Sequence, residues 1–493
     1  MNKLLILNLC LLFCTLHTFA QEDTQLGREL TLDEIVLLAK EQSPAALLAE
    51  TRKQNRYWAF RSFQADFRPQ LYLSGNLPAY RRTVSPIVQP NGNVAFRRLN
   101  QNRTQLNLGV SQVIGRTGGR VFIETELQRF DNFETDEVSY SGNPAVIGFS
   151  QQLFGFNPFK WDKVIAPLRY EESIKGYVED MEDISVVSTR LFFDVLLAQI
   201  NQELAEKNLA NNDTIYQISQ GRYNLGKIGE NDLLRVEYNV MRSRQEAAQA
   251  RLDLETNTLR LRSFIGLNET QPLVLILPGS IPQFEVDEQL AISEALQNHP
   301  NGVQFERRIK EAERDVARER GETGLNAQLE ATYGLTDRGD VFMDLYNNPE
   351  NQQQLGLNFF IPIVNWGRQK ARVKTQEALF ELTQYEVAQE QVNFEQEVYT
   401  QVKTFKMLRD QVELARAAND IAARKYEITK QRYLVGQITI TDFILALQEK
   451  DQARRDYISS LEDFWINFYD LRRLTLYDFA EDRSLLTEEI LGE

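Results

Sequence analysis

Cysteine and histidine are nearly absent from this chain. Its 493 residues include two cysteines, Cys10 and Cys14, and two histidines, His17 and His299. Three of these four residues lie within the first twenty positions, so a chain that starts at Gln21 keeps His299 alone. Disulfide frameworks, thiolate nucleophiles and zinc sites made of cysteine or paired histidine are therefore excluded. We predict no catalytic residue, no cofactor and no metal site.

Positive charge is also in the minority. Lys and Arg number 55 against 70 Asp and Glu, which gives a formal net charge of −15 and a pI near 5.0. A protein that binds nucleic acid needs a basic surface, so we predict no nucleic-acid partner. Hydrophobic residues make up 42% of the chain, which is enough to form a core and excludes a wholly disordered protein.

Long apolar segments are missing beyond the N-terminus. Lys3 precedes the apolar run 4–16, and Thr18-Phe19-Ala20 follows it. This order is typical of a secretory signal peptide, here residues 1–20. The run is too short to cross a bilayer as a helix, and no later segment has about 18 consecutive apolar residues. We predict an exported protein without a transmembrane helix.

Glycine and proline are absent from the 68 residues between Gly367 and Gly436. This stretch is rich in Glu, Gln, Lys, Arg and Ala, which favour a helix. Its apolar residues recur at a mean spacing near three and a half, which is typical of a coiled-coil seam. They are Ala378, Leu382, Tyr385, Ala388, Val392, Val398, Val402, Phe405, Leu408, Val412, Ala415, Ile421 and Ala422. The pattern predicts a single helix roughly 100 Å long.

A similar stretch runs from Phe159 to Gln220 and is interrupted only by Pro167 and Gly176. The two stretches end alike: residues 220–228 read QGRYNLGKI and residues 430–438 read KQRYLVGQI, at an offset of 210 positions. A further helical run follows each ending. The glycines of these endings, Gly226 and Gly436, are predicted to lie at helix–turn–helix tips, where a residue with positive φ ends a helix.

The repeat extends upstream, because the segments 31–66 and 287–320 are both helical in pattern and both contain a proline after a polar residue, Pro44 and Pro300. Each is followed by strands. The chain therefore reads as an internal duplication. The predicted divisions are a signal peptide at 1–20, a first repeat at 21–266, a linker at 267–286, a second repeat at 287–477 and a C-terminal tail at 478–493. In the first repeat, strands are predicted at about 70–154 and a long helix and tip at about 159–264. In the second repeat, strands are predicted at about 326–363 and a long helix and tip at about 366–475.

Between the helices the apolar period changes from 3.6 to 2. Alternation is clear around residues 106–111, 327–333 and 355–361, and weaker at 70–77 and 147–154. Runs of this length suit a soluble half-buried sheet and a tilted membrane strand equally well. Because the chain is predicted to be exported and to have no transmembrane helix, we favour membrane strands over a soluble sheet. The turn-rich stretches 78–103, 131–144 and 336–354 are then predicted to be loops that face the exterior.

Too few strands are present to close a barrel. We count four, or six if residues 119–130 form a hairpin with the strand at 106–111, and the tight turn of that hairpin is predicted at Gly115–Gly119. The smallest single-chain membrane barrels need about eight strands, and open sheet edges are not tolerated in lipid. A membrane barrel built from this chain must be shared between subunits.

Together these features resemble the TolC-like outer-membrane efflux proteins, also called outer membrane factors. The resemblance rests on Leu30-Thr31-Leu32-Asp33-Glu34 before a helix, on Ser43-Pro44, and on the duplicated Arg-Tyr-x-x-Gly tips. It implies a mainly helical fold with membrane strands, in which three subunits share one twelve-stranded barrel above a long helical periplasmic tunnel. It also implies that the protein is the exit duct of a tripartite efflux or type I secretion system in the outer membrane of a Gram-negative bacterium.

The same resemblance implies partners and site residues. The partners are two further copies of the chain, outer-membrane lipid, a periplasmic adaptor, and an inner-membrane pump of the RND, ABC or MFS type. Asp442 matches an acidic position of the tunnel entrance, and this sequence repeats the acid at Asp232, three residues before Arg235. The residues that match adaptor-docking tips are Arg222, Tyr223, Gly226, Arg432, Tyr433 and Gly436.

Two positions depart from the family pattern, and other interpretations remain for the two aspartates and for the whole chain. Ile438 and Leu445 stand where family gate residues are polar, so a gate here needs other contacts. Asp232 and Asp442 sit at helix starts, where a carboxylate stabilises the first turn without any pore. A periplasmic adaptor-type coiled-coil scaffold is the alternative for the whole chain, and a hydrolase with paired carboxylates is disfavoured because no pocket can be read from the sequence.

Overall fold

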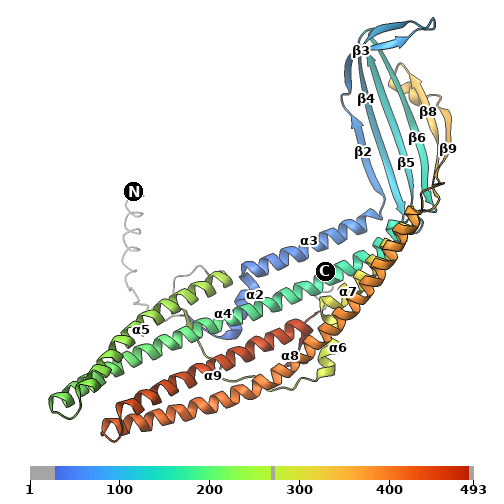
Figure 1. Ribbon diagram of the computed structural model, residues 1–493. Coiled ribbons are helices and arrows are strands. Elements are labelled where there is room, and N and C mark those ends of the chain that lie inside the picture. Colours follow the sequence, from blue (N-terminus) through green and yellow to red (C-terminus); the bar gives the residue numbers. More distant parts are fainter. Residues whose placement is uncertain (1–27, 268–272, 488–493) are drawn as a thin grey trace, which may run out of the picture. The chain divides into compact units, whose positions relative to one another are not determined.

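The structure is a computed structural model that describes residues 28–267 and 273–487 (Figure 1). The predicted signal peptide and the last six residues lie outside the described residues. The chain forms two compact units. The first unit comprises residues 1–49, 179–288 and 400–483, and the second comprises 50–178, 289–399 and 484–493. Each unit therefore combines segments of both predicted repeats.

The helices show the internal duplication in their lengths. Helix α4 and helix α8 have 67 residues each, and α5 and α9 have 36 each. The first and last residues of α4 and α5 recur 210 positions later as those of α8 and α9. The bounds of α2 and α3, which precede the strands, recur 256 positions later as those of α6 and α7. The helices are α2 (Leu32–Gln42), α3 (Pro44–Asp66), α4 (Pro158–Asn224), α5 (Glu230–Ile265), α6 (Glu288–Asn298), α7 (Pro300–Glu322), α8 (Arg368–Leu434) and α9 (Ile440–Thr475).

The breaks before the two prolines follow from local chemistry. Thr31 caps α2 with a reciprocal capping box to Glu34, and proline cannot supply the N–H that would continue α2 into α3. His299 caps α7 in the second repeat, because its Nδ1 accepts a hydrogen bond from the Asn301 N–H at 3.2 Å. The only histidine after the predicted signal peptide thus supports a helix start beside Pro300.

The long helix predicted between Gly367 and Gly436 is confirmed as α8, and α4 continues through Pro167 and Gly176. The predicted seam is only partly correct. Val398, Val402 and Phe405 are buried at 0–1% exposure, but four other members of the predicted seam remain largely exposed on the chain. They are Leu382 at 50%, Tyr385 at 67%, Val392 at 46% and Ile421 at 66%.

Aromatic residues fill the core of the first unit. Phe192 and Phe193 of α4 are fully buried, as are Phe405 of α8 and Phe464 of α9. Their rings meet at centroid distances of 5.2–5.3 Å. The part of the predicted linker that the structure describes packs on the same helices. Gln199 exchanges two hydrogen bonds with the Leu275 backbone, and β1 (Arg28–Leu30) pairs in parallel with β7 (Leu273–Leu275).

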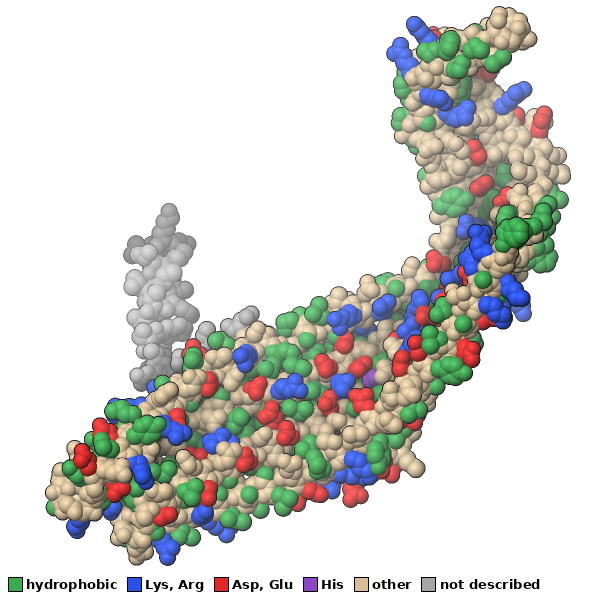
Figure 2. All heavy atoms as spheres, in the orientation of Figure 1, with side chains coloured by type: hydrophobic (Ala, Val, Ile, Leu, Met, Phe, Trp, Pro, Cys, Tyr) green, Lys and Arg blue, Asp and Glu red, His purple; other side chains and the backbone are tan. Residues whose placement is uncertain are grey.

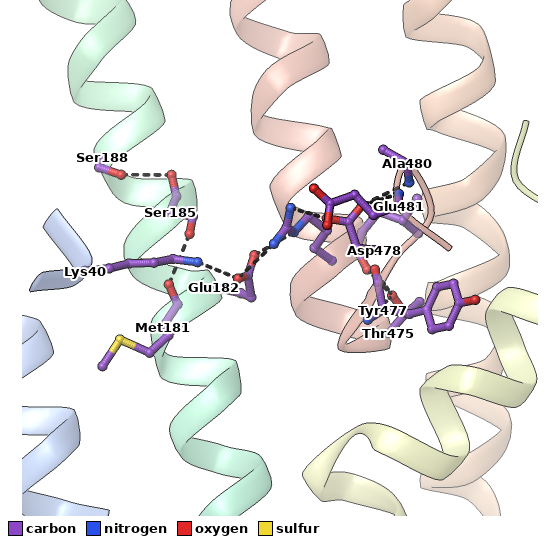
Figure 3. Close-up of polar contacts among 12 residues, drawn as sticks. Lys40, Met181, Glu182, Ser185, Ser188, Thr475, Tyr477, Asp478, Ala480 and Glu481 are labelled. Carbon is purple, nitrogen blue, oxygen red and sulfur yellow. Dashed lines mark hydrogen bonds and ion pairs between the residues drawn. The ribbon is translucent and has the colours of Figure 1, made fainter. Parts of the chain in front are cut away.

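A buried ion network joins three helices of the first unit to the chain after α9 (Figure 3). The Glu182 carboxylate, 3% exposed, accepts from Lys40 Nζ at 2.6 Å and from Arg472 Nε at 3.1 Å. Arg472 Nη1 also donates to Asp478 at 2.7 Å. Asp478 lies in the short strand β10 (Tyr477–Asp478), which precedes β11 (Arg483–Ser484). Buried charges are tolerated when they are paired in this way.

The second unit contains one antiparallel sheet with the order β2-β4-β5-β6-β8-β9. Strand β3 pairs with the first half of β4 and β2 with the second half, so these two strands share one position at the edge. The strands are β2 (Gln70–Asn76), β3 (Tyr80–Val88), β4 (Val94–Ile114), β5 (Gly119–Asn132), β6 (Glu137–Leu153), β8 (Asn326–Gly339) and β9 (Glu350–Phe360).

The predicted hairpin of residues 119–130 with the strand at 106–111 is confirmed, and the turn predicted at Gly115–Gly119 joins β4 to β5. The sheet exceeds the predicted count of six by one strand, because its seven strands occupy six positions. The difference between the two repeat offsets, 256 and 210, means that the first repeat holds 46 extra residues in its strand region. These residues supply the additional hairpin. The sheet is therefore wider than the four strands per subunit that a twelve-stranded barrel of three chains requires.

Two of the predicted exterior loops are largely wrong. The stretch 78–103 contains all of β3 and the start of β4, and the stretch 131–144 contains the end of β5 and the start of β6. The third stretch, 336–354, has a 3-10 helix (Phe342–Tyr346) between the ends of β8 and β9. These strand ends carry polar residues on both faces, which removes the period-2 signal on which the prediction relied.

The two faces of the sheet differ in polarity along most of its height. On one face, Leu71, Val110, Ile123 and Ile147 lie in one row across four strands, and each is 40–72% exposed. On the opposite face, Tyr72, Gly109 and Glu124 form the adjacent row, and the Tyr72 hydroxyl contacts Glu124 Oε2 at 3.1 Å. An exposed apolar face opposite a polar face is the pattern of a membrane barrel wall.

Candidate functional site

The two helical tips of the first unit are the sequence-predicted site, and they have the same backbone geometry. Gly226 and Gly436 have φ angles of +69° and +79°. The N–H of each glycine donates to the carbonyl of the tyrosine three residues earlier, and the following N–H donates to the carbonyl of the preceding arginine, all at 2.8–2.9 Å. This pair of bonds is a Schellman motif. The same spacing of arginine, tyrosine and glycine therefore occurs in both repeats because both helices end in the same motif.

The two tyrosines that precede these glycines differ in their surroundings. Tyr433 is 5% exposed and stacks on Phe443 at 5.2 Å, whereas Tyr223 is 39% exposed. Tyr433 belongs to an apolar cluster with Ile215, Val236, Tyr426, Phe443 and Leu447, against which Ile438 packs. Tyr433 thus supports the fold of the tips. Of this pair, Tyr223 is the one that is available to a partner.

Two arginines of the first tip reach the second tip. Arg222 lies over the Tyr433 ring at 5.6 Å and donates to the Leu434 carbonyl at 3.4 Å. Arg235 Nη1 donates to Thr441 Oγ1 at 2.8 Å. Three residues separate Asp232 and Arg235, which would allow them to pair on one helix face, but the Arg235 side chain crosses to the neighbouring tip instead. Sequence reasoning did not identify Thr441, since a contact between repeats depends on how the helix pairs pack.

The two entrance aspartates also differ. Asp442 forms a reciprocal capping box with Thr439, in which its carboxylate accepts from Thr439 Oγ1 at 2.7 Å and from the Thr439 N–H at 3.2 Å. Asp232 occupies the same position in the first turn of α5, but its N-cap is Gly229, which has no side chain to pair with it. Asp442 is thus held as a helix cap, and Asp232 keeps its carboxylate for other contacts.

A groove of about 630 Å³ separates the tips, and Asp232 and Arg222 line it together with Thr441 and Gly436. Beside it, apolar side chains lie open at both turns. Leu225 and Val435, which directly precede the tip glycines, are 74% and 69% exposed. The tips therefore present two matching exposed apolar side chains beside a groove whose lining is both polar and apolar.

A second set of charged residues, which the sequence did not single out, lies where α4 and α9 pack. Burial, together with the carboxylates of Asp194 and Asp463, raises the pKa of Glu462 to about 7, while Arg190 opposes this shift. Burial also raises the pKa of Asp194 and that of Asp463. This acidic cluster carries less negative charge near neutral pH than its three carboxyl groups would suggest.

Within residues 28–267 and 273–487, no helix has the length and apolar character needed to cross a membrane. No group of three or more metal-ligating side chains is found in the same ranges. The tips hold arginines, two aspartates of which Asp442 belongs to a capping box, and exposed apolar side chains.

Comparisons with known proteins agree with this geometry. The family model described as "Outer membrane efflux protein" matches residues 37–267 and 291–475. Its two matched segments correspond to the two repeats. A comparison with curated protein sequences finds no match.

The fold is similar to that of several solved outer-membrane proteins. The CmeC outer membrane channel of Campylobacter jejuni is 16% identical, with a TM-score of 0.66 over 94% of this chain and 88% of that chain. The outer membrane protein VceC of Vibrio cholerae is 13% identical, with a TM-score of 0.62 over 90% and 95%. The MtrE outer membrane channel of Neisseria gonorrhoeae, in its open state, is 15% identical, with a TM-score of 0.61 over 92% and 91%.

Proposed function

The chain belongs to the outer membrane efflux protein family, and we propose that it is the outer-membrane exit duct of a tripartite efflux or type I secretion system. In this proposal the sheet lies in the outer membrane of a Gram-negative bacterium and the long helices enclose a tunnel in the periplasm. The observation that carries the proposal is the sheet itself, which has one apolar exposed face, one polar face and two unpaired edges.

The open edges require other copies of the chain. Strand β9 ends the sheet on one side, and β2 with β3 ends it on the other. Unpaired backbone groups are not tolerated in lipid, and six strand positions are fewer than the smallest known membrane barrels use. Three copies, as the family resemblance implies, give a barrel with eighteen strand positions. Its lumen is wider than that of a twelve-stranded barrel, because diameter grows with strand number.

The helical part supports a tunnel with a narrow periplasmic end. Exposed apolar side chains of α8, such as Leu382 and Ile421, need a partner surface, and neighbouring copies would supply it. At the tips, a periplasmic adaptor would contact Tyr223, Arg432 and the exposed Leu225 and Val435. An inner-membrane pump of the RND, ABC or MFS type would supply the energy, and the duct itself would be passive.

Charge at the tips supports an entrance that attracts cations. Each copy contributes Asp232, which lines the groove between tips, and Asp442, which also caps α9. A ring of carboxylates in a narrow opening favours cations over anions. Asp232 is expected to carry most of this selectivity, because the Asp442 carboxylate is already engaged by Thr439.

Planar-bilayer conductance of the purified mature protein tests the proposal. The wild type should give a small cation-selective current, and Asp232→Ala should reduce the selectivity more than Asp442→Ala does. Asp442→Ala should instead lower the stability of the tip by about 1 kcal/mol, as the loss of a helix cap does. A preparation that never enters a bilayer and stays in the aqueous fraction would favour the periplasmic adaptor-type scaffold instead.

A further inference from the structure

The segment from residue 67 to residue 123 has a charge composition unlike the rest of the chain. It contains eight arginines and no Asp, Glu or Lys, in a protein whose net charge is −15. Four of these arginines lie on the hairpin of β3 and β4, namely Arg81, Arg82, Arg97 and Arg98, and all four are exposed. Figure 2 shows Lys and Arg side chains over the β3 end of the sheet.

The strand register places these four arginines on two different faces. Arg82 is opposite Asn100 and Val84 is opposite Arg98, so Arg82 and Arg98 lie on the face that carries Leu106, Leu108 and Val110. Arg81 is opposite Gln101 and Arg97 is opposite Ser85, which puts them on the polar face. Diagonal neighbours on paired strands are about 7–8 Å apart, so Arg82 and Arg98 form one local pair on the apolar face.

Along that apolar face the residue types change from the helical end of the sheet outward, and at the outer end exposed Val84 and Phe96 flank Arg98. The apolar segment of β4 begins at Leu106, and beyond it lies a band with Tyr80 and Tyr140 at the level of Arg129. Arg129 is neutralised there by Asp131, to which its Nη2 donates at 2.7 Å. Aromatic residues mark the border between the apolar and aqueous regions of membrane barrels. Arg82 and Arg98 lie beyond this border, roughly 15 Å from Leu106 along the membrane normal.

No acid neutralises the outer pair. Within the part of the chain that the structure describes, neither Arg82 nor Arg98 forms an ion pair. Arginine binds phosphate well, because its planar guanidinium donates two parallel hydrogen bonds. A phospholipid headgroup layer is about 5–8 Å thick, which is less than the roughly 15 Å between Leu106 and the outer pair. A lipid with a large phosphorylated saccharide headgroup would extend further.

We propose that Arg82 and Arg98 form a docking surface for the phosphorylated saccharide headgroup of an outer-leaflet lipid. This inference depends on the proposed function, because it requires the sheet to lie in the outer membrane with its β3–β4 hairpin outward. The pair on the apolar face contacts lipid, and the pair on the polar face, Arg81 and Arg97, faces the lumen. The barrel is thereby held at a fixed depth in the outer leaflet.

The test compares two double variants that change charge equally on the same two strands. Purified mature protein in detergent is titrated with fluorescently labelled lipopolysaccharide, with the same lipid after removal of its phosphates, and with phosphatidylglycerol. R82Q/R98Q should weaken lipopolysaccharide binding roughly thirtyfold, because each of the two basic residues near an anionic surface strengthens binding about fivefold. R81Q/R97Q should change it less than twofold, and dephosphorylated lipid should bind weakly to every variant.

Several outcomes would overturn the inference. If the two double variants weakened lipopolysaccharide binding equally, the arginines would attract the lipid equally from the apolar and the polar face of the sheet. Equal binding of phosphatidylglycerol would point to a general anionic lipid, and full competition by millimolar inorganic phosphate would point to a free-anion site. Channel conductance, measured on the same preparations, separates this test from that of the proposed function. A wild type without conductance speaks against the duct, whereas conducting variants with unchanged lipid affinity speak against the lipid surface alone.

Discussion

At the scale of single residues, the tip glycines show how one residue type has opposite effects in two backbone contexts. Gly226 and Gly436 have positive φ, and nothing lies within 4 Å of a Cβ built on either. Gly221 has equally free space but lies inside α4 without a positive φ. The conformation of the backbone, and not steric crowding, therefore decides what alanine does at each position.

We predict that Gly226→Ala and Gly436→Ala each destabilise the first unit by about 1–2 kcal/mol, the cost of a left-handed conformation for a residue with a Cβ. The matched control Gly221→Ala should stabilise it by about 0.5–1 kcal/mol, because alanine favours a helix interior. Thermal unfolding followed by circular dichroism measures both effects. A loss of stability in Gly221→Ala as large as in the tip variants would contradict this account.

A second residue-scale prediction concerns Glu462. Its folded-state pKa of about 7 lies above its ordinary value of 4.5, so the folded state binds its proton more tightly than the unfolded state does. Glu462 therefore costs nothing well below about pH 4.5, its destabilising effect grows as the pH rises from about 4.5 to about 7, and the effect is constant at higher pH. We predict that Glu462→Gln stabilises the protein by about 1–2 kcal/mol at pH 8, a value discounted for partial solvent access.

The comparison for Glu462→Gln is its stability difference from the wild type at pH 5 and at pH 8. That difference should be small at pH 5 and larger at pH 8. Glu246→Gln, on the exposed surface of α5, should behave alike at both pH values and serves as the control. An effect of Glu462→Gln that does not depend on pH would show that Asp194, Asp463 and Arg190 do not set the proton affinity of this carboxyl group.

At the scale of elements, the buried ion network of the first unit links α2, α4 and α9 through Glu182. We predict that Glu182→Gln costs about 3 kcal/mol, because it leaves the partly buried Lys40 without its carboxylate and leaves Arg472 with Asp478 as its remaining partner. The exposed pair of Lys207 and Glu203 on α4 provides a control, since Glu203→Gln should change stability by less than about 0.5 kcal/mol. Chemical denaturation of the two variants distinguishes them, and equal losses would mean that the network is not the link.

The sequence predicted the helices better than the strand ends, and the reason is physical. Helix α8 has 67 residues, and its sequence predicts this length because it contains no Gly or Pro and has periodic apolar residues. The outer halves of β4 to β6 are held mainly by backbone pairing and carry polar residues on both faces, so no local pattern marks them. The tip contact between Arg235 and Thr441 was equally invisible, because the two residues are 206 positions apart.

At the scale of the whole molecule, the two repeats have diverged where they meet different surroundings. The helical hairpins kept identical lengths, whereas the first repeat gained the extra hairpin of the sheet. Equal hairpins are expected of elements that pack around a common tunnel. The wider sheet changes only the barrel, so we predict a larger open-state conductance for this protein once its tips are opened than for a relative with four strands per copy.

The larger open-state conductance can be seen only when the tips are open, and we predict that variants without the contacts between repeats open them. Arg222→Ala/Arg235→Ala deletes the hydrogen bonds from the first tip to Leu434 and Thr441. Its single-channel conductance in a planar bilayer should rise severalfold over the wild type, because the entrance and not the barrel limits the current. An unchanged conductance in a well-folded variant would place the narrowest point elsewhere.

If copies of this chain join their sheet edges to close one barrel, β2 of one copy lies beside β9 of the next, and cross-linking between these two strands detects the contact. The chain after the predicted signal peptide has no cysteine, so Leu73→Cys on β2 and Leu357→Cys on β9 introduce the only thiols. In membranes treated with a short thiol cross-linker, the double variant should give a ladder that ends at three chains, and neither single variant should give it. A double variant that remains monomeric, or a ladder that stops at two chains or continues past three, would contradict the account.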